Sequence, residues 1–250
     1  LAETYNLANG ATTEAGANLG PGPLNSDGAA PVTLNGNSAS SDVNINSGIF
    51  NLNGELTDVS DLTVSGGATV NLGSNERIDD PTTVNILPDG ALNLNGTETV
   101  RSYNSSGTLG LSPGATSGTL LVTESPINLM DGHLSLNGTN LQNLGGQNPQ
   151  LTSNGNVVIS GTAGTTSEGP DNATINVGAL DIETGTLTLN GLLINPEGII
   201  NIRPGATLVS GSSDRINGDS STLNLETGAT WTLGGDDAIG TFNASGLLNG

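Results

Sequence analysis

Cysteine and lysine are both absent from the 250-residue sequence, and its four cations, all arginines, stand against 24 acidic residues. The lack of cysteine excludes disulfides, thiolate metal ligands and cysteine nucleophiles. The formal net charge of −20 excludes the basic patch that nucleic acids and anionic lipids require, so we expect no nucleic-acid partner. Apolar runs are also short of the roughly 18 residues that a membrane span needs, so we expect no membrane insertion of this segment.

Aromatic residues make up only 2% of the chain, whereas glycine contributes 38 residues. A core built on large rings is therefore excluded. Long helices are excluded as well, because Gly, Asn, Thr and Ser are dense and no window keeps the 3.6-residue period for three turns. Aliphatic residues are still frequent enough for a folded protein, and we expect them to pack in thin, evenly distributed layers.

One short unit recurs along the chain: an apolar–Asn–apolar triplet (once with Asp in the middle), a turn that ends in glycine, and a second alternating strand. Triplets stand at 43–45, 84–86, 127–129, 180–182, 200–202 and 223–225. Steps of about 20 residues fit one turn of a three-sided β-solenoid, in which each coil pairs with its neighbours. Alternation directs the outer two side chains of a triplet inward and the middle one outward. We therefore expect Asn85 and Asn201 to face solvent, and we predict a core that includes Ile45, Ile86, Leu129, Ile182, Ile202 and Leu225.

Asn-Gly pairs also mark antiparallel hairpins, so a β-sandwich is the main structural alternative. The constant order of triplet, glycine turn and strand favours the solenoid, as do the small aliphatic core residues. We predict an all-β fold: a parallel solenoid over 32–250, whose coils are each about 20 residues long, preceded at 1–31 by an irregular cap or an atypical first coil. Residues 161–170 are expected to form a projecting loop. Because the chain begins with Leu1, we expect a fragment of a longer protein.

Two segments, Gly-Ala-Thr-Val-Asn-Leu at 67–72 and Gly-Ala-Thr-Leu at 205–208, resemble strand openings in autotransporter and filamentous-haemagglutinin-type passenger domains. The segment 232–240 is similar to the repeat punctuation of the same proteins. The resemblance covers most of 32–250. It implies a right-handed parallel β-helix, export to the outer cell surface or the medium, and a role in adhesion or in a biofilm matrix. Implied partners are host, neighbouring-cell or matrix surfaces, including glycans, and self-association is a further option.

Carboxylates are the candidates for enzymatic chemistry, because parallel β-helices also host polysaccharide-degrading enzymes. A glycoside hydrolase needs an acid and a base carboxylate that face one groove, whereas neighbours in a strand point to opposite faces. The chain also offers few cations and few aromatic platforms for sugars. We therefore expect no catalytic residue and no enzyme. The carboxylates considered are Asp79-Asp80, Asp236-Asp237 and the pair Asp214 and Asp219 around Arg215, and the aromatic residues are Tyr5, Phe50, Tyr103, Trp231 and Phe242.

Metal and ice-binding sites are weakly supported. His133 is the single histidine, and without cysteine it cannot form a zinc site of the usual type, so we interpret it as an exposed turn residue. Calcium-loop motifs are missing, so we expect no cofactor beyond loosely bound calcium. The segments 186–188 and 230–232 have the Thr-x-Thr form of ice-binding ladders, but they do not repeat at one register in every coil.

The interpretation that accounts for most of these features is a non-enzymatic adhesin segment, secreted or exposed on a bacterial surface, with no defined binding residues. The alternative is a self-assembling structural filament or matrix protein, in which coils stack end to end. A polysaccharide-degrading β-helix enzyme is the further alternative.

Overall fold

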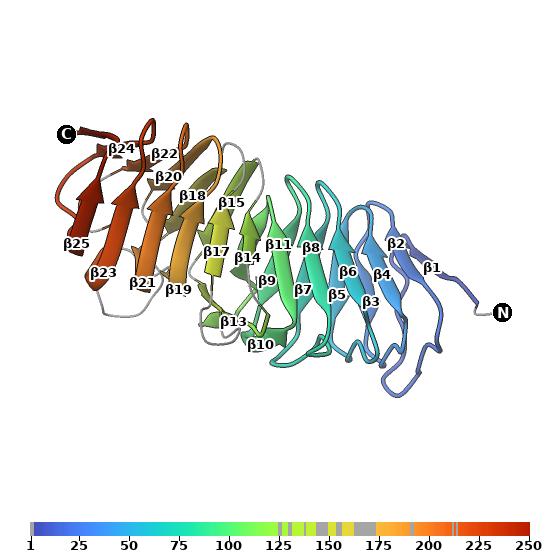
Figure 1. Cartoon of the computed structure of the whole chain (residues 1–250). Coiled ribbons are helices and arrows are strands. Elements are labelled where there is room, and N and C mark those ends of the chain that lie inside the picture. The colour runs from blue at the N-terminus through green and yellow to red at the C-terminus, as the bar shows by residue number, and fades with distance from the viewer. Residues whose placement is uncertain are drawn as a thin grey trace. The chain divides into compact units, whose positions relative to one another are not determined.

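The computed structural model describes residues 3–124, 127–129, 132–137, 139–143, 150–153, 157–162, 174–190, 193–211, 213 and 215–250. Its regular elements are all β-strands (Figure 1). Among the described residues, no helix is long and apolar enough to cross a membrane. The chain divides into two compact units, Leu1–Leu121 and Val122–Gly250, which we take in turn.

Unit 1 is built from strands that each pair in parallel with the strand about 20 residues earlier. Its first sheet contains β1 (Tyr5–Ala8), β2 (Leu24–Asp27), β4 (Asp42–Ile45), β6 (Asp61–Val64), β8 (Thr83–Ile86) and β11 (Ser102–Ser105). Its second sheet contains β3 (Val32–Leu34), β5 (Ile49–Leu52), β7 (Thr69–Leu72), β9 (Ala91–Leu94) and β12 (Thr108–Leu111). The third side holds the parallel bridges Leu19↔Ser38, Ser38↔Leu56 and Leu56↔Ile78, followed by β10 (Gly96–Val100) and β13 (Gly118–Val122).

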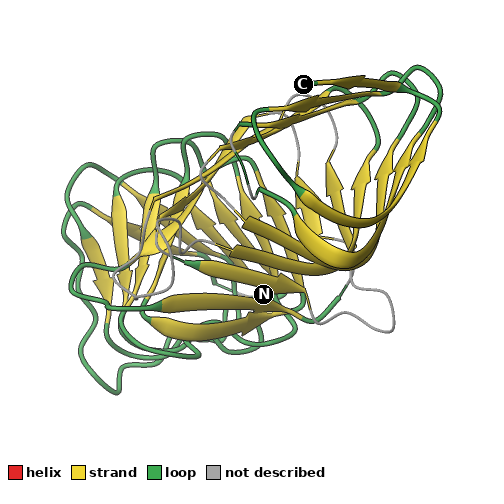
Figure 2. Ribbon diagram, turned by 90° about the vertical axis from the view of Figure 1, so that its left-hand side faces the viewer, coloured by secondary structure: helices red, strands yellow, loops and turns green. Residues whose placement is uncertain are grey.

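Unit 2 repeats this arrangement, with parallel strands stacked across each sheet and joined by turns (Figure 2). Its first sheet contains β14 (Ile127–Leu129), β17 (Gln150–Ser153), β19 (Thr174–Ile182), β21 (Leu193–Ile202), β23 (Asn217–Leu225) and β25 (Ala238–Ala244). Its second sheet contains β15 (Gly132–Asn137), β18 (Val157–Thr162), β20 (Thr186–Asn190), β22 (Thr207–Ser210), β24 (Thr230–Leu233) and β26 (Leu247–Asn249). The short β16 (Asn140–Asn143) pairs with the beginning of β19.

These pairings confirm the predicted all-β solenoid with coils of about 20 residues. The sandwich alternative is wrong, because the strands pair in parallel with neighbouring coils and not as antiparallel hairpins. The hand of the coil stays a prediction. The segment 1–31 contains β1 and β2, which pair at Tyr5↔Leu24 and Asn6↔Asn25. Thr12 and Leu19 make the bridges of the other two sides.

The core lies between the sheets and is made of the inward-facing aliphatic residues of each strand. All six residues predicted from the triplets are at most 1% exposed, which confirms the alternation that directs them inward. Larger rings are also absorbed there: Phe50 and Tyr103 are fully buried, and Trp231 is 4% exposed. The core can therefore contain one aromatic ring in a coil, although aromatic residues are too few in the sequence to form the core by themselves.

Glycines at the corners meet two different requirements. Gly48, Gly205 and Gly228 have φ between 73° and 83°, the left-handed conformation that favours glycine after a triplet. The Asn-Gly corners at 35–36 and 53–54 instead need close approach, because a Cβ on Gly54 would lie 2.0 Å from the carbonyl oxygen of Gly36 in the coil below. Close packing between coils, and not a positive φ, therefore requires glycine at these two corners.

Outward asparagines of both sheets form amide ladders, which the sequence does not predict. Asn85 and Asn201 of the triplets are half-buried at outward positions. In each rung, the side-chain nitrogen donates to the side-chain oxygen of the asparagine one coil earlier. The rungs measure 2.8 to 3.1 Å and are Asn25 to Asn6, Asn44 to Asn25 and Asn104 to Asn85 in the first sheet of unit 1, Asn71 to Asn51 and Asn93 to Asn71 in its second sheet, and Asn224 to Asn201 and Asn243 to Asn224 in unit 2.

Replacing a ladder asparagine with aspartate tests whether these rungs stabilise the fold. Asn71 donates to Asn51 and accepts from Asn93, so Asn71→Asp loses a donor and sets a carboxylate against an acceptor. We expect a loss of about 1–2 kcal/mol in the free energy of unfolding. Asn46→Asp adds the same charge at an exposed turn and should change it by less than about 0.5 kcal/mol. Urea denaturation followed by far-UV circular dichroism measures both, and equal losses would show that charge alone is responsible.

Candidate functional site

The third side of unit 1 carries a polar turn, Asn75-Glu76-Arg77-Ile78-Asp79-Asp80, between β7 and β8. Ile78 points into the core and is 2% exposed. Because the coils up to Ile78 are joined on this side by single bridges and not by a continuous ladder, backbone N–H groups of this turn need other acceptors. Side chains of neighbouring coils provide them.

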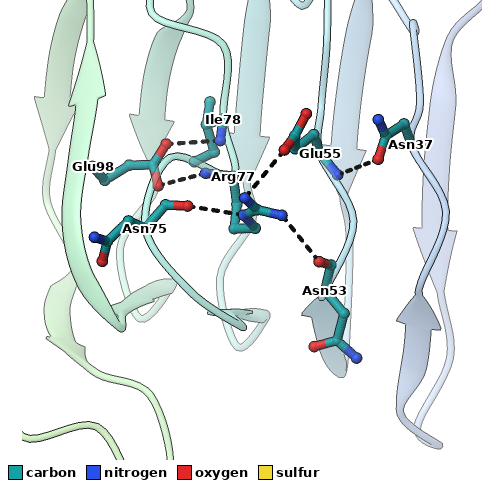
Figure 3. Close-up of polar contacts among 7 residues, drawn as sticks. All are labelled: Asn37, Asn53, Glu55, Asn75, Arg77, Ile78 and Glu98. Atoms are coloured by element: carbon teal, nitrogen blue, oxygen red, sulfur yellow. Dashed lines mark hydrogen bonds and ion pairs between the residues drawn. The ribbon is translucent and has the colours of Figure 1, made fainter. Parts of the chain in front are cut away.

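Glu98 of β10 is the acceptor for the middle of this turn. Its Oε2 accepts the backbone N–H of Arg77 at 2.9 Å, and its Oε1 accepts that of Ile78 at 2.7 Å (Figure 3). The residue is 1% exposed. Burial raises the pKa of Glu98 to about 8, against the lowering effect of these two hydrogen bonds, and the charge of Glu76 adds to the increase. The Glu98 side chain thus holds the turn of the preceding coil.

Arg77 connects the same turn to the coil on its other side. Its Nη2 lies 3.1 Å from Oε1 of Glu55, and its Nη1 donates to the carbonyl oxygen of Asn53 at 3.3 Å. Its Nε donates to the carbonyl oxygen of Asn75 at 2.9 Å (Figure 3). The Glu55 side chain is 45% exposed, so solvent weakens this ion pair and its contribution is about 1 kcal/mol or less. Arg77 and Glu98 together join three coils.

Unit 2 contains a second turn of the same construction. Oδ1 of Asp237 accepts the backbone N–H of Arg215 at 2.7 Å and that of Ile216 at 3.0 Å. Nε of Arg215 donates to the carbonyl oxygen of Ser213 at 2.9 Å, as Arg77 does to Asn75. Sequence reasoning overlooked this motif. Its signal is an Arg-Ile dipeptide followed by an acidic residue 21 or 22 positions after the arginine.

The carboxylates considered as catalytic candidates differ in their surroundings. Oδ2 of Asp79 accepts the backbone N–H of Asp58 at 2.9 Å, and Asp237 holds the turn described above, whereas Asp80 and Asp236 are exposed. Asp214 and the side chain of Asp219 lie outside the described residues.

Asp79 and Asp80 line one shallow hollow of about 250 Å³, together with Glu55, Leu56, Thr57, Glu76 and Ile78. The pair lies in a turn, where strand alternation does not apply. In the described part of the chain, no group of three or more His, Cys, Asp or Glu is placed to hold a metal ion.

A cationic bridge also stabilises the first sheet of unit 2, where Asp181 occupies the ladder position next to Asn201. Arg203 lies 2.8 Å from Oδ1 of Asp181 through Nη2 and 2.9 Å from Oε1 of Glu226 through Nη1. The hydrogen bond to Glu226 is the main reason that the pKa of Arg203 is raised. The arginine thus offsets a carboxylate in the ladder row.

His133 is the second residue of β15, and its backbone pairs with Val158 of β18. It lies in a strand, so our interpretation of it as a turn residue is wrong, and its side chain is outside the described residues. The predicted loop at 161–170 also lies outside them, except for Gly161 and Thr162 at the end of β18.

Threonines form two short rows on the second sheet of unit 2. Thr186, Thr207 and Thr230 share one register, and beside them runs the row Thr188, Val209 and Thr232. The two Thr-x-Thr segments at 186–188 and 230–232 therefore share one register across these three coils. Their alignment is hidden in the sequence because the coils differ in length. The first row ends at Leu247 and the second at Asn249, so the threonine pattern does not continue.

An uncharged groove of about 340 Å³ lies on the second sheet of unit 1, and we call it the amide groove. It is lined by Thr33, Asn51, Asn53, Asn71, Leu72, Gly73, Asn95, Ser112 and Pro113. Two rows of amides meet there. The strand row is the ladder of Asn51 and Asn71, and in the corner row Asn53 donates to Oδ1 of Asn35 at 2.8 Å and Asn95 to the carbonyl oxygen of Gly73 at 2.7 Å.

The pKa of Glu98 predicts how stability depends on pH. Its folded-state pKa of about 8 lies above its ordinary value of 4.5, so the folded chain keeps a proton that the unfolded chain releases. The contribution of Glu98 to the free energy of unfolding should therefore decrease as pH rises from about 4.5 to 8.

Glu98→Gln cannot ionise, so the wild type should lose stability relative to this variant across that interval. Thermal unfolding between pH 4.5 and 8.5 measures the difference, and Glu14→Gln, at an exposed position, is the control for removing one charge. A difference between wild type and Glu98→Gln that stays constant with pH would contradict the assignment.

Comparison with protein-family models, with curated proteins and with solved structures finds no match for this chain. The resemblance to autotransporter-type passenger domains is supported only at the level of a β-solenoid repeat region. Adhesion, export and partners stay predictions, and any function assigned to the chain rests on its own geometry.

Proposed function

We propose that this chain is a non-enzymatic contact segment of an extracellular or cell-surface protein, which binds host, neighbouring-cell or matrix surfaces through its solenoid faces. The observation that carries the proposal is the repetition of uncharged polar side chains at one register on successive coils. Examples are the asparagines of the amide groove and the threonine rows of unit 2. Such rows offer the same group to a partner again and again.

Repeated identical side chains favour a binding function over a catalytic one. A single hydrogen bond contributes about 0.5–1.5 kcal/mol net, which is too little for attachment. A row of such groups on a rigid scaffold adds many hydrogen bonds to the binding free energy, because each further contact is made at high effective concentration. The amides are also held in place by their ladder bonds, so little side-chain entropy is lost on binding.

The carboxylates favour the same proposal over the enzyme alternative. Asp79 and Asp237 accept backbone N–H groups, and Glu98 is buried beneath a turn. These acids therefore serve the fold. The five aromatic residues offer little for stacking on sugars, because three of them are buried. Phe242 is 42% exposed and packs edge-to-face on Trp231 at 5.8 Å.

Adhesion of beads coated with the chain tests the proposal. We expect retention on bacterial lawns or matrix-coated surfaces above that of beads coated with an unrelated acidic protein. Retention should increase as sodium chloride rises from about 0.01 M to about 0.15 M, because screening shortens the range of repulsion between the chain and acidic surfaces from about 30 Å to about 8 Å.

Three results would count against the proposal. Retention equal to the control protein would overturn it, and retention that decreases with salt would indicate charge-driven binding instead of contact through uncharged rows. Release of sugar products from polysaccharides, abolished by Asp79→Ala or Asp80→Ala, would identify an enzyme that uses the acidic hollow.

A further inference from the structure

We propose that the amide groove of unit 1 binds an extended, uncharged polysaccharide that lies along the stacking direction, with about one sugar unit over each coil. This inference rests on the proposed contact function and names the ligand class of one surface. The groove lining comes from β3, β5 and β7 and from the turns after β5, β7, β9 and β12. It therefore crosses five successive coils of unit 1.

The spacing of the coils favours this class of ligand. Parallel strands stack about 4.8 Å apart, which is close to the length of one pyranose unit in an extended chain. In a polysaccharide that lies across the strands, the sugar units therefore repeat at nearly the same spacing as the coils, so that each coil faces one unit with its hydroxyls. A peptide in the same direction repeats its side chains on one face every two residues, at about 6.6–6.8 Å, and falls out of phase within a few coils.

The amides have unused hydrogen-bonding capacity. An asparagine side chain has two N–H donors and an oxygen with two lone pairs. Asn71 uses one donor toward Asn51 and one acceptor position toward Asn93, which leaves one of each. Sugar hydroxyls also donate and accept, so they match a row of groups that does both. Thr33 adds a hydroxyl at one end of the groove, where it accepts from Asn51 at 3.4 Å.

Charge and shape restrict the ligand further. The groove lining contains no charged residue, and the chain carries a net charge of −20, so anionic polysaccharides are repelled without a compensating arginine or lysine. Gly73 keeps the groove open, because a Cβ there would lie 2.6 Å from Oδ1 of Asn53. No aromatic side chain lines the groove, so we expect weak binding per sugar unit that accumulates with ligand length.

Length-graded oligosaccharides test the inference. The probes are cello-oligosaccharides, xylo-oligosaccharides and chito-oligosaccharides of two to six units, with oligogalacturonate as the anionic control and dextran as the non-extended control. Isothermal titration calorimetry on the whole chain should give an affinity for at least one neutral series that rises with each added unit up to about five. Oligogalacturonate and dextran should bind at least tenfold more weakly.

Two double variants separate the groove from the fold. Asn51→Ala with Asn71→Ala removes amides of the groove, and Asn25→Ala with Asn44→Ala removes ladder amides of the first sheet, outside the groove lining. Both lose rungs, and thermal unfolding of each measures the cost. Only the groove variant should lose affinity, by tenfold or more. Asn95→Ala, which removes one rim amide, should weaken binding by two- to fivefold with little change in unfolding temperature.

Several outcomes would overturn the inference: absence of binding to all three neutral series, stronger binding to oligogalacturonate, no dependence on length, or equal loss in both folded double variants. Coated beads that adhere while the chain binds no neutral oligosaccharide would refute the groove assignment and leave the contact function intact. Failure of both experiments would refute the two proposals together.

Discussion

Pairing of each coil with the coil before it is the interaction on which every other feature depends. A strand such as β4 has four residues and cannot stand alone, but it pairs with β2 on one side and β6 on the other. Parallel, in-register stacking places equivalent residues directly above one another. The same operation that buries Val43 and Ile45 therefore also aligns Asn44 with Asn25, and the ladders follow from the pairing without a separate cause.

Where no continuous backbone ladder joins the coils, side chains accept the hydrogen bonds of backbone N–H groups. On the third side of unit 1, single bridges join the coils up to Ile78, and Glu98 supplies two acceptors for the turn at Arg77 and Ile78. Burying a carboxylate is costly unless it is hydrogen-bonded, and the raised pKa of Glu98 reflects that cost. The same arrangement recurs at Asp237, so both units contain a turn whose backbone N–H groups are satisfied by an acidic side chain of the next coil.

The core could be predicted from the sequence because it depends on local alternation: Ile86 and Ile202 follow directly from their triplets. Contacts between residues of different coils could not be predicted, because the coils vary in length. The unequal spacing of Thr186, Thr207 and Thr230 along the chain conceals their common register, and nothing near Glu98 in the sequence shows that its partners are Arg77 and Ile78. The alternation rule holds only within strands, so it does not apply to turn residues such as Asp79 and Asp80. Contacts along the stack require the register, which only the structure supplies.

Charge is distributed unevenly over the surface of unit 1. Acidic residues gather at turns such as 75–80, where the hollow at Asp79 and Asp80 contains four carboxylates, while the amide groove on the second sheet contains none. Because charges repel across a Debye length of about 8 Å at physiological ionic strength, the acidic corners oppose close approach of neighbouring chains there. A partner can approach most closely on an uncharged row, where no carboxylate has to be desolvated. The repeat that sets the core spacing thus also sets the spacing of the groups available for recognition, so a ligand with a matching period benefits from every coil that it crosses.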